Sequence, residues 1–552
     1  MPVPSADQIF AALWHPNSKW VTPTITFSIP VIGSSWPGYN SEAYQSTADY
    51  GVLNAVQAGN FRLATDAWAR LIAVPVMETS DLANPGEIRV AFSTISTGAV
   101  GQYAPPVNQE LHPTWGDIWL DRNTFGNTTL SPNDNSPSGF GSAAYFVLLH
   151  ELGHTLGLKH PHEGDATLPL PWANARYSLI AYDGLHDSTI FSFSQGATQI
   201  LRDFYFVKIA TPMVFDVLAI QRLYGSNTTD VRDTIYSWSG TKNYLDTIYD
   251  AGGVDSIDLT EHTRSSIVDL TPGAYSSIDY WPIEQQKAHW LSVLPSAAHL
   301  ISLSFDDPQA KTYTYTWHDN LGIAYGTIIE NVSGGSGDDT ITGNEANNRL
   351  SGNDGADRIF GGMGNDTLTG GEGQSYLRGD EGNDSISGGD QFDDINGNMG
   401  NDTVNGGAGD DYAVGGKDND SLTGDAGVDI VWGNLGDDTC SGGDGADQVR
   451  GGQGNDSVAG GAGDDFVSGD RGDDTITGGL GADLFHTSQD AGVDRVLDFS
   501  LAEGDRVFLD LGTTYTTSQV GADTIIDMGS GNQMILVGVQ LSTLTPGWIF
   551  GA

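Results

Sequence analysis

Cysteine, basic residues and long hydrophobic runs are all scarce in this chain of 552 residues. The single cysteine, Cys440, has no partner for an intrachain disulfide, so disulfides cannot hold the fold together. No run of ~18 apolar residues occurs, which argues against a membrane-spanning helix. The first residues, MPVPSADQIF, lack the basic region and the long apolar segment of a secretory signal peptide, and we therefore expect none.

The shortage of basic residues gives the chain a strongly acidic balance. It has 23 Lys and Arg against 71 Asp and Glu, a formal net charge of −48. A nucleic-acid-binding surface needs a basic stripe, and docking on anionic lipid needs a basic patch, so both classes of partner are excluded. Hydrophobic residues make up 38% of the chain, which is enough for real cores. At ~100–200 residues per domain, the length predicts two to four domains.

Glycine is abundant, with 73 residues, and its excess falls in a nine-residue repeat. From position 334 to position 486 the chain divides into 17 units without insertion, typified by GGMGNDTLT at 361–369. The first position is Gly in all 17 units, the sixth is Asp in 15, and the eighth is always apolar. A flexible linker has no reason to keep this phase, so the repeat predicts a stacked array.

Each unit predicts a six-residue turn followed by a three-residue strand. Glycine permits positive φ, and the Asp carboxylates and turn carbonyls offer the all-oxygen shell that Ca²⁺ prefers. The one inward apolar residue per unit is buried only when units stack, which predicts an all-β parallel β-roll. The units at 343–351 and 388–396 are degenerate and contribute no predicted ligand. The predicted calcium ligands are Asp339, Asp357, Asp366, Asp384, Asp402, Asp411, Asp420, Asp429, Asp438, Asp447, Asp456, Asp465, Asp474 and Asp483.

Calcium is predicted to control folding of this segment. Without calcium the carboxylates would repel one another across a thin core, so we expect disorder in chelator and folding when calcium binds. The nonapeptide resembles the RTX repeat of secreted bacterial proteins.

Residues 150–160 read HELGHTLGLKH, an H-E-x-x-H-x-x-G-x-x-H pattern that follows an apolar, helix-compatible run. On a helix His150 and His154 face the same side, and Gly157 can end the helix with positive φ, so that His160 returns as a third ligand. Three neutral imidazoles with an open position are typical of a catalytic zinc site. Glu151 is placed to take a proton from the attacking water and deliver it to the leaving amine.

This motif is that of metzincin metalloproteases, and together with the repeats the chain resembles the serralysin family of secreted bacterial peptidases. Residues 176–184, RYSLIAYDG, align with the family's Met-turn, although Ile180 stands at the Met position. The resemblance makes this residue an apolar floor beneath the zinc, where an Ile of similar volume can pack. Tyr182 matches the family tyrosine that coordinates the resting ion and then hydrogen-bonds the developing oxyanion. A plain core aromatic is the alternative for Tyr182.

The resemblance predicts a multidomain α+β chain with the β-roll at its C-terminal side. The expected divisions are a metzincin-type zinc protease domain at 1–235, a strand-rich region packing on the roll at 236–333, the roll at 334–486, and a C-terminal cap with a secretion signal at 487–552. Residues 87–95, EIRVAFSTI, alternate in polarity and predict an edge strand that binds substrate by strand addition. A buried strand with no substrate role is the alternative.

The resemblance implies a secreted bacterial endopeptidase with one catalytic zinc and several structural calcium ions. The implied partners are protein or peptide substrates, the type I secretion machinery and a proteinaceous inhibitor, and we expect a monomer. The departure at Ile180 leaves a second hypothesis open: a weak or inactive protease-like protein that uses its calcium roll for extracellular attachment or assembly.

Overall fold

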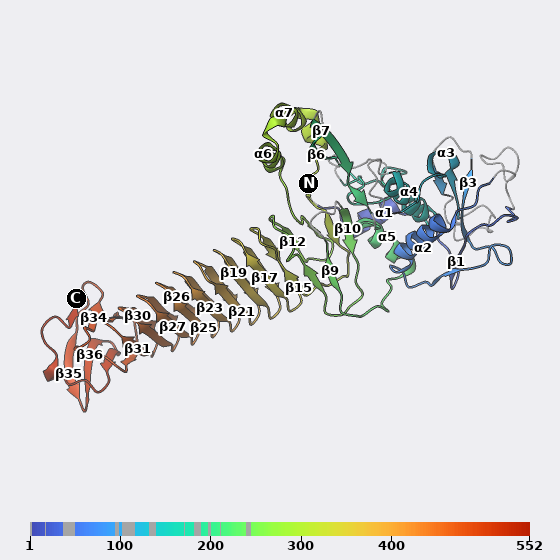
Figure 1. Cartoon of the computed structure of the whole chain (residues 1–552). Helices are drawn as coiled ribbons and strands as arrows, with labels where there is room; N and C mark the ends of the chain where they lie inside the picture. The colour runs from blue at the N-terminus through green and yellow to red at the C-terminus, as the bar shows by residue number, and fades with distance from the viewer. Residues whose placement is uncertain are drawn as a thin grey trace. The chain divides into compact units, whose positions relative to one another are not determined.

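The computed structural model divides the chain into two compact units (Figure 1). The N-terminal unit comprises Met1–Arg232, Thr241–Gly253 and Pro272–Thr327, and the roll unit comprises Asp233–Gly240, Val254–Thr271 and Ile328–Ala552. The residues that the structure describes are 3–16, 18–36, 50–93, 99–101, 116–131, 140–169, 172–181, 189–196, 200–209, 211–238 and 244–551.

The α-helices of the described residues all lie in the N-terminal unit. They are α1 (Ala6–Leu13), α2 (Ala55–Ala69), α3 (Arg122–Phe125), α4 (Phe140–Thr155), α5 (Val214–Tyr224), α6 (Ile283–Val293), α7 (Ala298–Asp306) and α8 (Pro308–Tyr313). A capping box starts α1, in which Ser5 and Gln8 each accept a hydrogen bond from the other's backbone N–H. Asn54 and Gln57 start α2 in the same way. Over the described ranges, none of these helices combines the length and apolarity needed to cross a membrane.

A five-stranded sheet forms the core of this unit with α2 and α4. Its order is β2 (Val76–Glu78), β1 (Ile25–Ser28), β3 (Ile88–Ser93), β5 (Asp117–Asp121) and β4 (Ala99–Gly101), and only β4 runs antiparallel to its neighbour. The edge-strand prediction for 87–95 is wrong, because β3 pairs with strands on both sides and its side chains are all buried. The polar residue that suggested exposure, Arg89, is 3% exposed and donates to the Asp117 carboxylate at 2.9 and 3.0 Å.

Two smaller sheets complete the N-terminal unit. The hairpin pairs β6 (Thr189–Gln195) with β7 (Ile200–Phe206). The other sheet has the order β13 (Tyr275–Ser276), β14 (Leu321–Ile323), β10 (Tyr244–Ile248) and β8 (Lys208–Ile209). Helices α6 to α8 occupy residues 283–313, within the range 236–333 that the sequence predicted to be strand-rich.

The roll unit consists of two long sheets, named here sheet A and sheet B, and successive strands of the repeat alternate between them (Figure 1). Sheet A has 15 strands in the order β35 (Thr516–Val520), β36 (Asp523–Gly529), β37 (Asn532–Leu536), β33 (Val493–Val496), β31 (Thr475–Leu480), β29 (Ser457–Ala462), β27 (Thr439–Asp444), β25 (Ser421–Ala426), β23 (Thr403–Ala408), β21 (Ser385–Gly389), β19 (Thr367–Glu372), β17 (Arg349–Asp354), β15 (Asn331–Ser333), β11 (Ser256–Asp258) and β9 (Ile235–Ser237). Sheet B has 12 strands in the order β12 (Ile267–Asp269), β16 (Thr340–Thr342), β18 (Arg358–Met363), β20 (Tyr376–Glu381), β22 (Asp394–Met399), β24 (Tyr412–Lys417), β26 (Ile430–Leu435), β28 (Gln448–Gln453), β30 (Phe466–Arg471), β32 (Leu484–Thr487), β34 (Arg506–Leu509) and β38 (Ile549–Phe550).

The parallel register of the roll confirms the stacked-repeat prediction. Leu350 pairs with Leu368, which pairs with Ile386, so each eighth-position residue stacks on the one 18 residues later. These side chains are fully or almost fully buried, and they form the thin core between the sheets. The strands are longer than the predicted three residues: β18 pairs with β20 as far as Met363 and Glu381. The glycine-rich start of each unit therefore stays in the hydrogen-bonded ladder, and the turn between strands is shorter than six residues.

Strands outside the repeat extend both sheets. β9, β11, β12 and β15 precede the repeats, and β33 to β38 follow them. The range 236–333 is divided, because β10, β13, β14 and α6 to α8 belong to the N-terminal unit. The division into four domains given by the sequence stays a proposal.

Candidate metal centres

Helix α4 positions the first two histidines of the motif. His150 and His154 lie one turn apart near its C-terminal end, as the sequence predicts. Gly157 has φ +103° and follows the helix, and a Cβ at this position would overlap the carbonyl oxygen of Ser18. Only glycine therefore suits this turn, and the chain beyond it brings His160 back to the helix.

The three imidazoles converge on one point. The Nε2 atom of His154 lies 3.1 Å from Nε2 of His150 and 3.1 Å from Nε2 of His160, and the remaining pair is 3.3 Å apart. Tetrahedral ligands at zinc–nitrogen distances of 2.0–2.1 Å would be about 3.3 Å apart, so the three nitrogens have the spacing of one zinc site. The three residues are 4–6% exposed.

The opposite ring nitrogens hold the rings in place. Nδ1 of His150 donates to the carbonyl oxygen of Leu179 at 2.9 Å, and Nδ1 of His154 to that of Leu158 at 2.8 Å. Nδ1 of His160 lies 2.7 Å from the Glu163 carboxylate. Each contact places the proton on Nδ1 and leaves the Nε2 lone pair for a metal. Sequence reasoning missed Glu163, although its i,i+3 spacing from His160 was a usable signal.

Burial keeps the imidazoles neutral, which is the protonation state that metal binding requires. It lowers the pKa of His150 to about 4 and that of His154 well below its usual value. Burial lowers the pKa of His160 as well, against the opposing effect of Glu163.

The structure describes two of the three remaining predicted residues of this site. Glu151 is 8% exposed and directly follows His150 on α4. Ile180 is fully buried, and a Cβ on Gly153 would overlap its Cδ1 atom, so the isoleucine packs directly against the helix backbone. Tyr182 lies outside the described residues.

A buried carboxylate fixes the loop that contains Ile180. Asp216, in the first turn of α5, accepts hydrogen bonds from the Ser178 hydroxyl at 2.6 Å, from the Leu179 N–H at 2.6 Å and from the Met213 N–H at 2.9 Å. Burial raises the pKa of Asp216 to about 6. Sequence reasoning missed this residue, because a single Asp within an apolar helix carries no spacing signal.

A second centre runs along the roll as a ladder of carboxylates. The Oδ1 atom of Asp384 accepts from the backbone N–H of Asp366 at 2.8 Å, and Oδ1 of Asp402 accepts from Asp384 at 2.8 Å. The other oxygen, Oδ2, is buried and has no hydrogen-bond partner among the described residues for most members of the ladder. Those members are Asp357, Asp366, Asp384, Asp393, Asp402, Asp411, Asp420, Asp429, Asp438, Asp447, Asp456, Asp465 and Asp474.

These unsatisfied oxygens fit a hard cation. A Cβ on Gly361 would overlap both Oδ2 of Asp366 and the carbonyl oxygen of Gly379, so the first-position glycine keeps space beside two oxygen ligands. Burial raises the pKa of Asp402 to about 7 and that of Asp420 to about 8, and neighbouring carboxylates add to both shifts. A buried anion without a partner is costly, and Ca²⁺ would remove that cost.

Two positions need separate description, and the calcium ligands stay a prediction throughout. Asp393, which was left out because its unit is degenerate, has the same two contacts as its neighbours: its Oδ1 accepts from the Ser375 N–H at 2.7 Å and its Oδ2 is unsatisfied. Asp339 starts the ladder, and both of its oxygens accept backbone hydrogen bonds, from Ser266 at 2.6 Å and Gly335 at 2.8 Å.

Known proteins resemble this chain. The family model described as RTX calcium-binding nonapeptide repeat matches in overlapping segments that together run from residue 329 to residue 492. A serralysin of Photorhabdus luminescens is 27% identical over 308 residues, 53% of this chain and 54% of that protein. Serralysin G of Dickeya chrysanthemi is 30% identical over 313 residues, covering 52% and 54%. The metallopeptidase AprA of Pseudomonas marginalis is 28% identical over 314 residues, covering 52% and 54%.

The matches with these proteins span about half the length of each curated relative. The repeat match coincides with the long run of parallel strands that follows the α/β unit. The chain is therefore a serralysin-like protein that carries RTX calcium-binding repeats.

Proposed function

We propose that this chain is a secreted zinc-dependent endopeptidase whose roll unit folds around calcium. The observation that carries the proposal is the convergence of three buried Nε2 atoms within 3.3 Å of one another, with Glu151 next to the first ligand. The similarity to proteins named serralysin and metallopeptidase supports the same reaction class.

The proposed mechanism assigns each residue one task. His150, His154 and His160 would hold a zinc ion, which supplies a Lewis acid that polarises the scissile carbonyl and makes water a stronger acid. Glu151 accepts the proton of the attacking water and returns it to the leaving amine nitrogen. The Leu179 and Leu158 carbonyls and the Glu163 carboxylate keep the three rings oriented. Tyr182, as the donor to the developing oxyanion, stays a prediction.

The substrate and the cellular context are part of the same proposal. Strand addition needs an edge strand with unpaired backbone groups. Among the described strands of the five-stranded sheet, β4 is the edge strand next to β5. Protein or peptide substrates would therefore pair with β4. Extracellular location, type I export, a proteinaceous inhibitor and a monomeric state stay predictions from the resemblance.

Casein hydrolysis by the calcium-loaded protein tests the mechanism. We expect Glu151→Ala to lose at least a hundredfold in kcat/KM, since general acid–base catalysis contributes about 10²–10⁴-fold. The control Glu503→Ala, an exposed carboxylate of the roll unit, should match the wild type. A zinc chelator should abolish activity in both active proteins. Equal activity of Glu151→Ala and wild type would remove the mechanism.

The second hypothesis, a weak or inactive protease-like protein, rests on Ile180. Its burial and its close packing against Gly153 support the expectation that the isoleucine can take the place of the methionine in this turn. We therefore expect stoichiometric zinc and casein hydrolysis with Ile180 in place. A folded, calcium-loaded protein with neither would favour attachment or assembly instead.

A further inference from the structure

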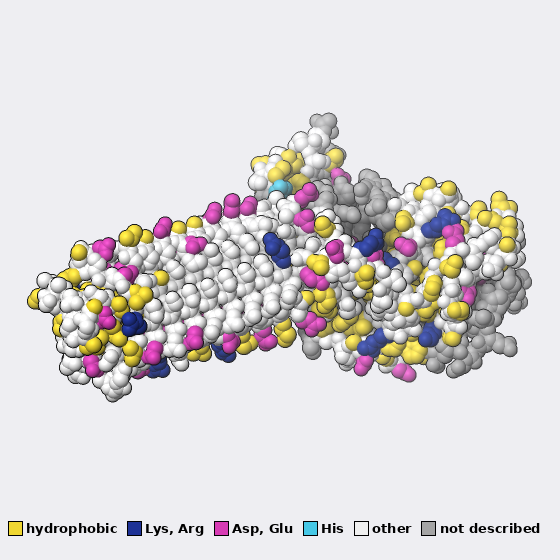
Figure 2. All heavy atoms as spheres, turned by 90° about the horizontal axis from the view of Figure 1, so that it is seen from below, with side chains coloured by type: hydrophobic (Ala, Val, Ile, Leu, Met, Phe, Trp, Pro, Cys, Tyr) yellow, Lys and Arg dark blue, Asp and Glu magenta, His cyan; other side chains and the backbone are white. Residues whose placement is uncertain are grey.

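The two outer faces of the roll carry different side chains, although one repeat builds both. The first outward position of successive sheet A strands holds small hydroxyl residues, namely Thr367, Ser385, Thr403, Ser421, Thr439 and Ser457. The outward positions of sheet B hold rings and guanidinium groups, among them Tyr376, Arg378, Tyr412, Trp432, Arg450 and Phe466. Figure 2 shows a broad face of the roll with almost no coloured side chains, which agrees with the Ser and Thr residues on the outer face of sheet A.

The difference between the two outer faces is not needed for the repeat units to stack on one another. The inward residue of each unit builds the core of both sheets alike. Cross-strand ring pairs such as Tyr412 and Trp432, with centroids 5.3 Å apart, stabilise a sheet, but that benefit would apply equally to sheet A. The concentration of rings on one face therefore points to a role outside the fold.

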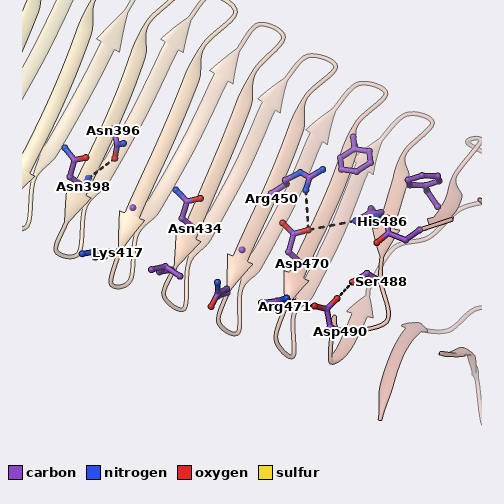
Figure 3. Close-up of a pocket in the computed structure, with 17 residues that line it drawn as sticks. Asn396, Asn398, Lys417, Asn434, Arg450, Asp470, Arg471, His486, Ser488 and Asp490 are labelled. Carbon is purple, nitrogen blue, oxygen red and sulfur yellow. Dashed lines mark hydrogen bonds and ion pairs between the residues drawn. The ribbon is translucent and has the colours of Figure 1, made fainter. Parts of the chain in front are cut away.

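Sheet B is also hollowed by a groove of about 940 Å³ that crosses its strands from β22 to β34 (Figure 3). Asn398, Gly416, Asn434 and Gly452 line it at paired positions of four successive strands. Because these side chains are short or absent, they leave the groove open. Seven strands at a spacing of ~4.8 Å make it about 29 Å long, enough for several units of an extended polymer.

A row of rings forms part of the groove lining. Phe466 and His486 stack with centroids 5.6 Å apart, and His486 and Phe508 follow at 5.5 Å. Arg450 lies over Phe466 at 5.3 Å.

The charges that line the groove balance one another. Arg471 pairs with Asp490 at 2.6 Å, and Nε2 of His486 lies 3.2 Å from Asp510. Arg450 faces Asp470 at 3.6 Å, and Figure 3 shows this pair together with His486. These pairs give the groove no net positive charge to attract a polyanion, and the chain's formal charge of −48 opposes one.

We propose that this groove of sheet B binds a neutral polysaccharide chain. The apolar face of a sugar ring can pack against the exposed side chain of Leu435 and the parts of Phe466 and Phe508 that line the groove. The faces of these two rings are already contacted by their neighbours on adjacent strands, so the sugar would not stack on them. Sugar hydroxyls both donate and accept hydrogen bonds, which matches amide side chains and paired charges better than any single ion does. The roll would then hold the protein on an extracellular polysaccharide, a role that goes beyond peptide hydrolysis and does not depend on it.

Isothermal titration of the calcium-loaded full chain tests the proposal, with cellohexaose, maltohexaose and N-acetylchitohexaose as probes. We expect at least one probe to bind, and Phe466→Ala to weaken it at least tenfold. Phe360→Ala is the matched control, because Phe360 is a ring of the same sheet on β18 and does not line the groove. Gln453→Ala is a second test variant, since this exposed amide lines the groove and can be removed without touching the core.

Circular dichroism in calcium first verifies that each variant is folded. The proposal is overturned if no probe binds at millimolar concentration, or if Phe466→Ala and Gln453→Ala bind as tightly as Phe360→Ala. Binding of polygalacturonate or single-stranded DNA alone, lost at high salt, would also overturn it, because it would show a polyanion site. Failure of this test leaves casein hydrolysis unaffected, so the two proposals are separable.

Discussion

Asp216 holds the backbone of Leu179 from one side: its carboxylate accepts the Leu179 N–H at 2.6 Å. On the other side the Leu179 carbonyl accepts from Nδ1 of His150 at 2.9 Å. A carboxylate on α5 is thus linked to a candidate zinc ligand on α4 through a single peptide segment. This arrangement makes Asp216 a positioning residue rather than a catalytic one.

Replacement of this carboxylate should weaken zinc binding. In Asp216→Asn the amide oxygen can still accept from the Leu179 and Met213 N–H groups, but the amide NH2 then faces the Ser178 hydroxyl. This buried hydroxyl loses its acceptor at a cost of about 1–3 kcal/mol. We expect the zinc affinity to fall about tenfold, which is the lower end of the loss of about 10–100-fold seen when a residue that supports a metal ligand is replaced. Competition with a zinc indicator measures this. The exposed Asp66→Asn is the control, and unchanged zinc affinity in a destabilised Asp216→Asn protein would limit Asp216 to a structural role.

The contact between Gly153 and Ile180 predicts a coupled pair of mutations. Gly153→Ala should destabilise the wild type, because the new Cβ overlaps Cδ1 of Ile180. In an Ile180→Ala background the same change should be neutral or stabilising, since Ala favours a helix over Gly by about 1 kcal/mol. A double-mutant cycle of urea unfolding should give a coupling energy of about 0.5–3 kcal/mol. Additive effects would show that the two residues do not touch.

The raised aspartate pKa values predict an inverted pH dependence for the metal-free roll. The pKa values of Asp402 and Asp456 are raised to about 7, whereas unfolded Asp titrates near about 3.9. Between these values the folded metal-free state binds more protons than the unfolded state, so the free energy of unfolding falls as pH rises. The strand signal in circular dichroism should be stronger at pH about 5 than at pH about 8 after calcium is removed.

Calcium should reverse this trend, because protons compete with the ion for the same carboxylates. The calcium-loaded protein is therefore expected to be most stable at neutral to alkaline pH. A metal-free sample that is better folded at alkaline pH would mean that the carboxylates are not desolvated as described.

Asp393 is expected to bind calcium like its neighbours. Its carboxylate has the same ladder hydrogen bond and the same unsatisfied oxygen as Asp402. Asp393→Asn and Asp402→Asn should therefore raise the calcium midpoint of folding by similar factors. Asp394→Asn, which alters a neighbouring residue outside the ladder, is the control. If Asp393→Asn folded at the same calcium concentration as the wild type while Asp402→Asn did not, the unit at 388–396 would not bind calcium, as the sequence predicted.

Local spacing made much of this molecule predictable. The 150–160 motif and the nine-residue period each fix positions relative to a helix turn or a strand. His150, His154 and the ladder aspartates could therefore be identified from the sequence. Long-range pairing could not be identified in this way. The alternating polarity of 87–95 predicted an edge strand, whereas Arg89 is buried and donates to Asp117 on another strand. Asp393 was left out of the predicted calcium ligands for a related reason. The groups around its carboxylate come from the units stacked on either side, whereas the prediction considered only the degenerate unit that contains it.

Zinc content is the most direct test of the central claim. The calcium-loaded protein, dialysed against trace zinc and measured by atomic absorption, should hold one zinc per chain. His154→Ala should hold none, whereas the exposed neighbour His162→Ala should keep it. Wild type without stoichiometric zinc, or His154→Ala with it, would contradict the assignment of these three histidines as a metal centre.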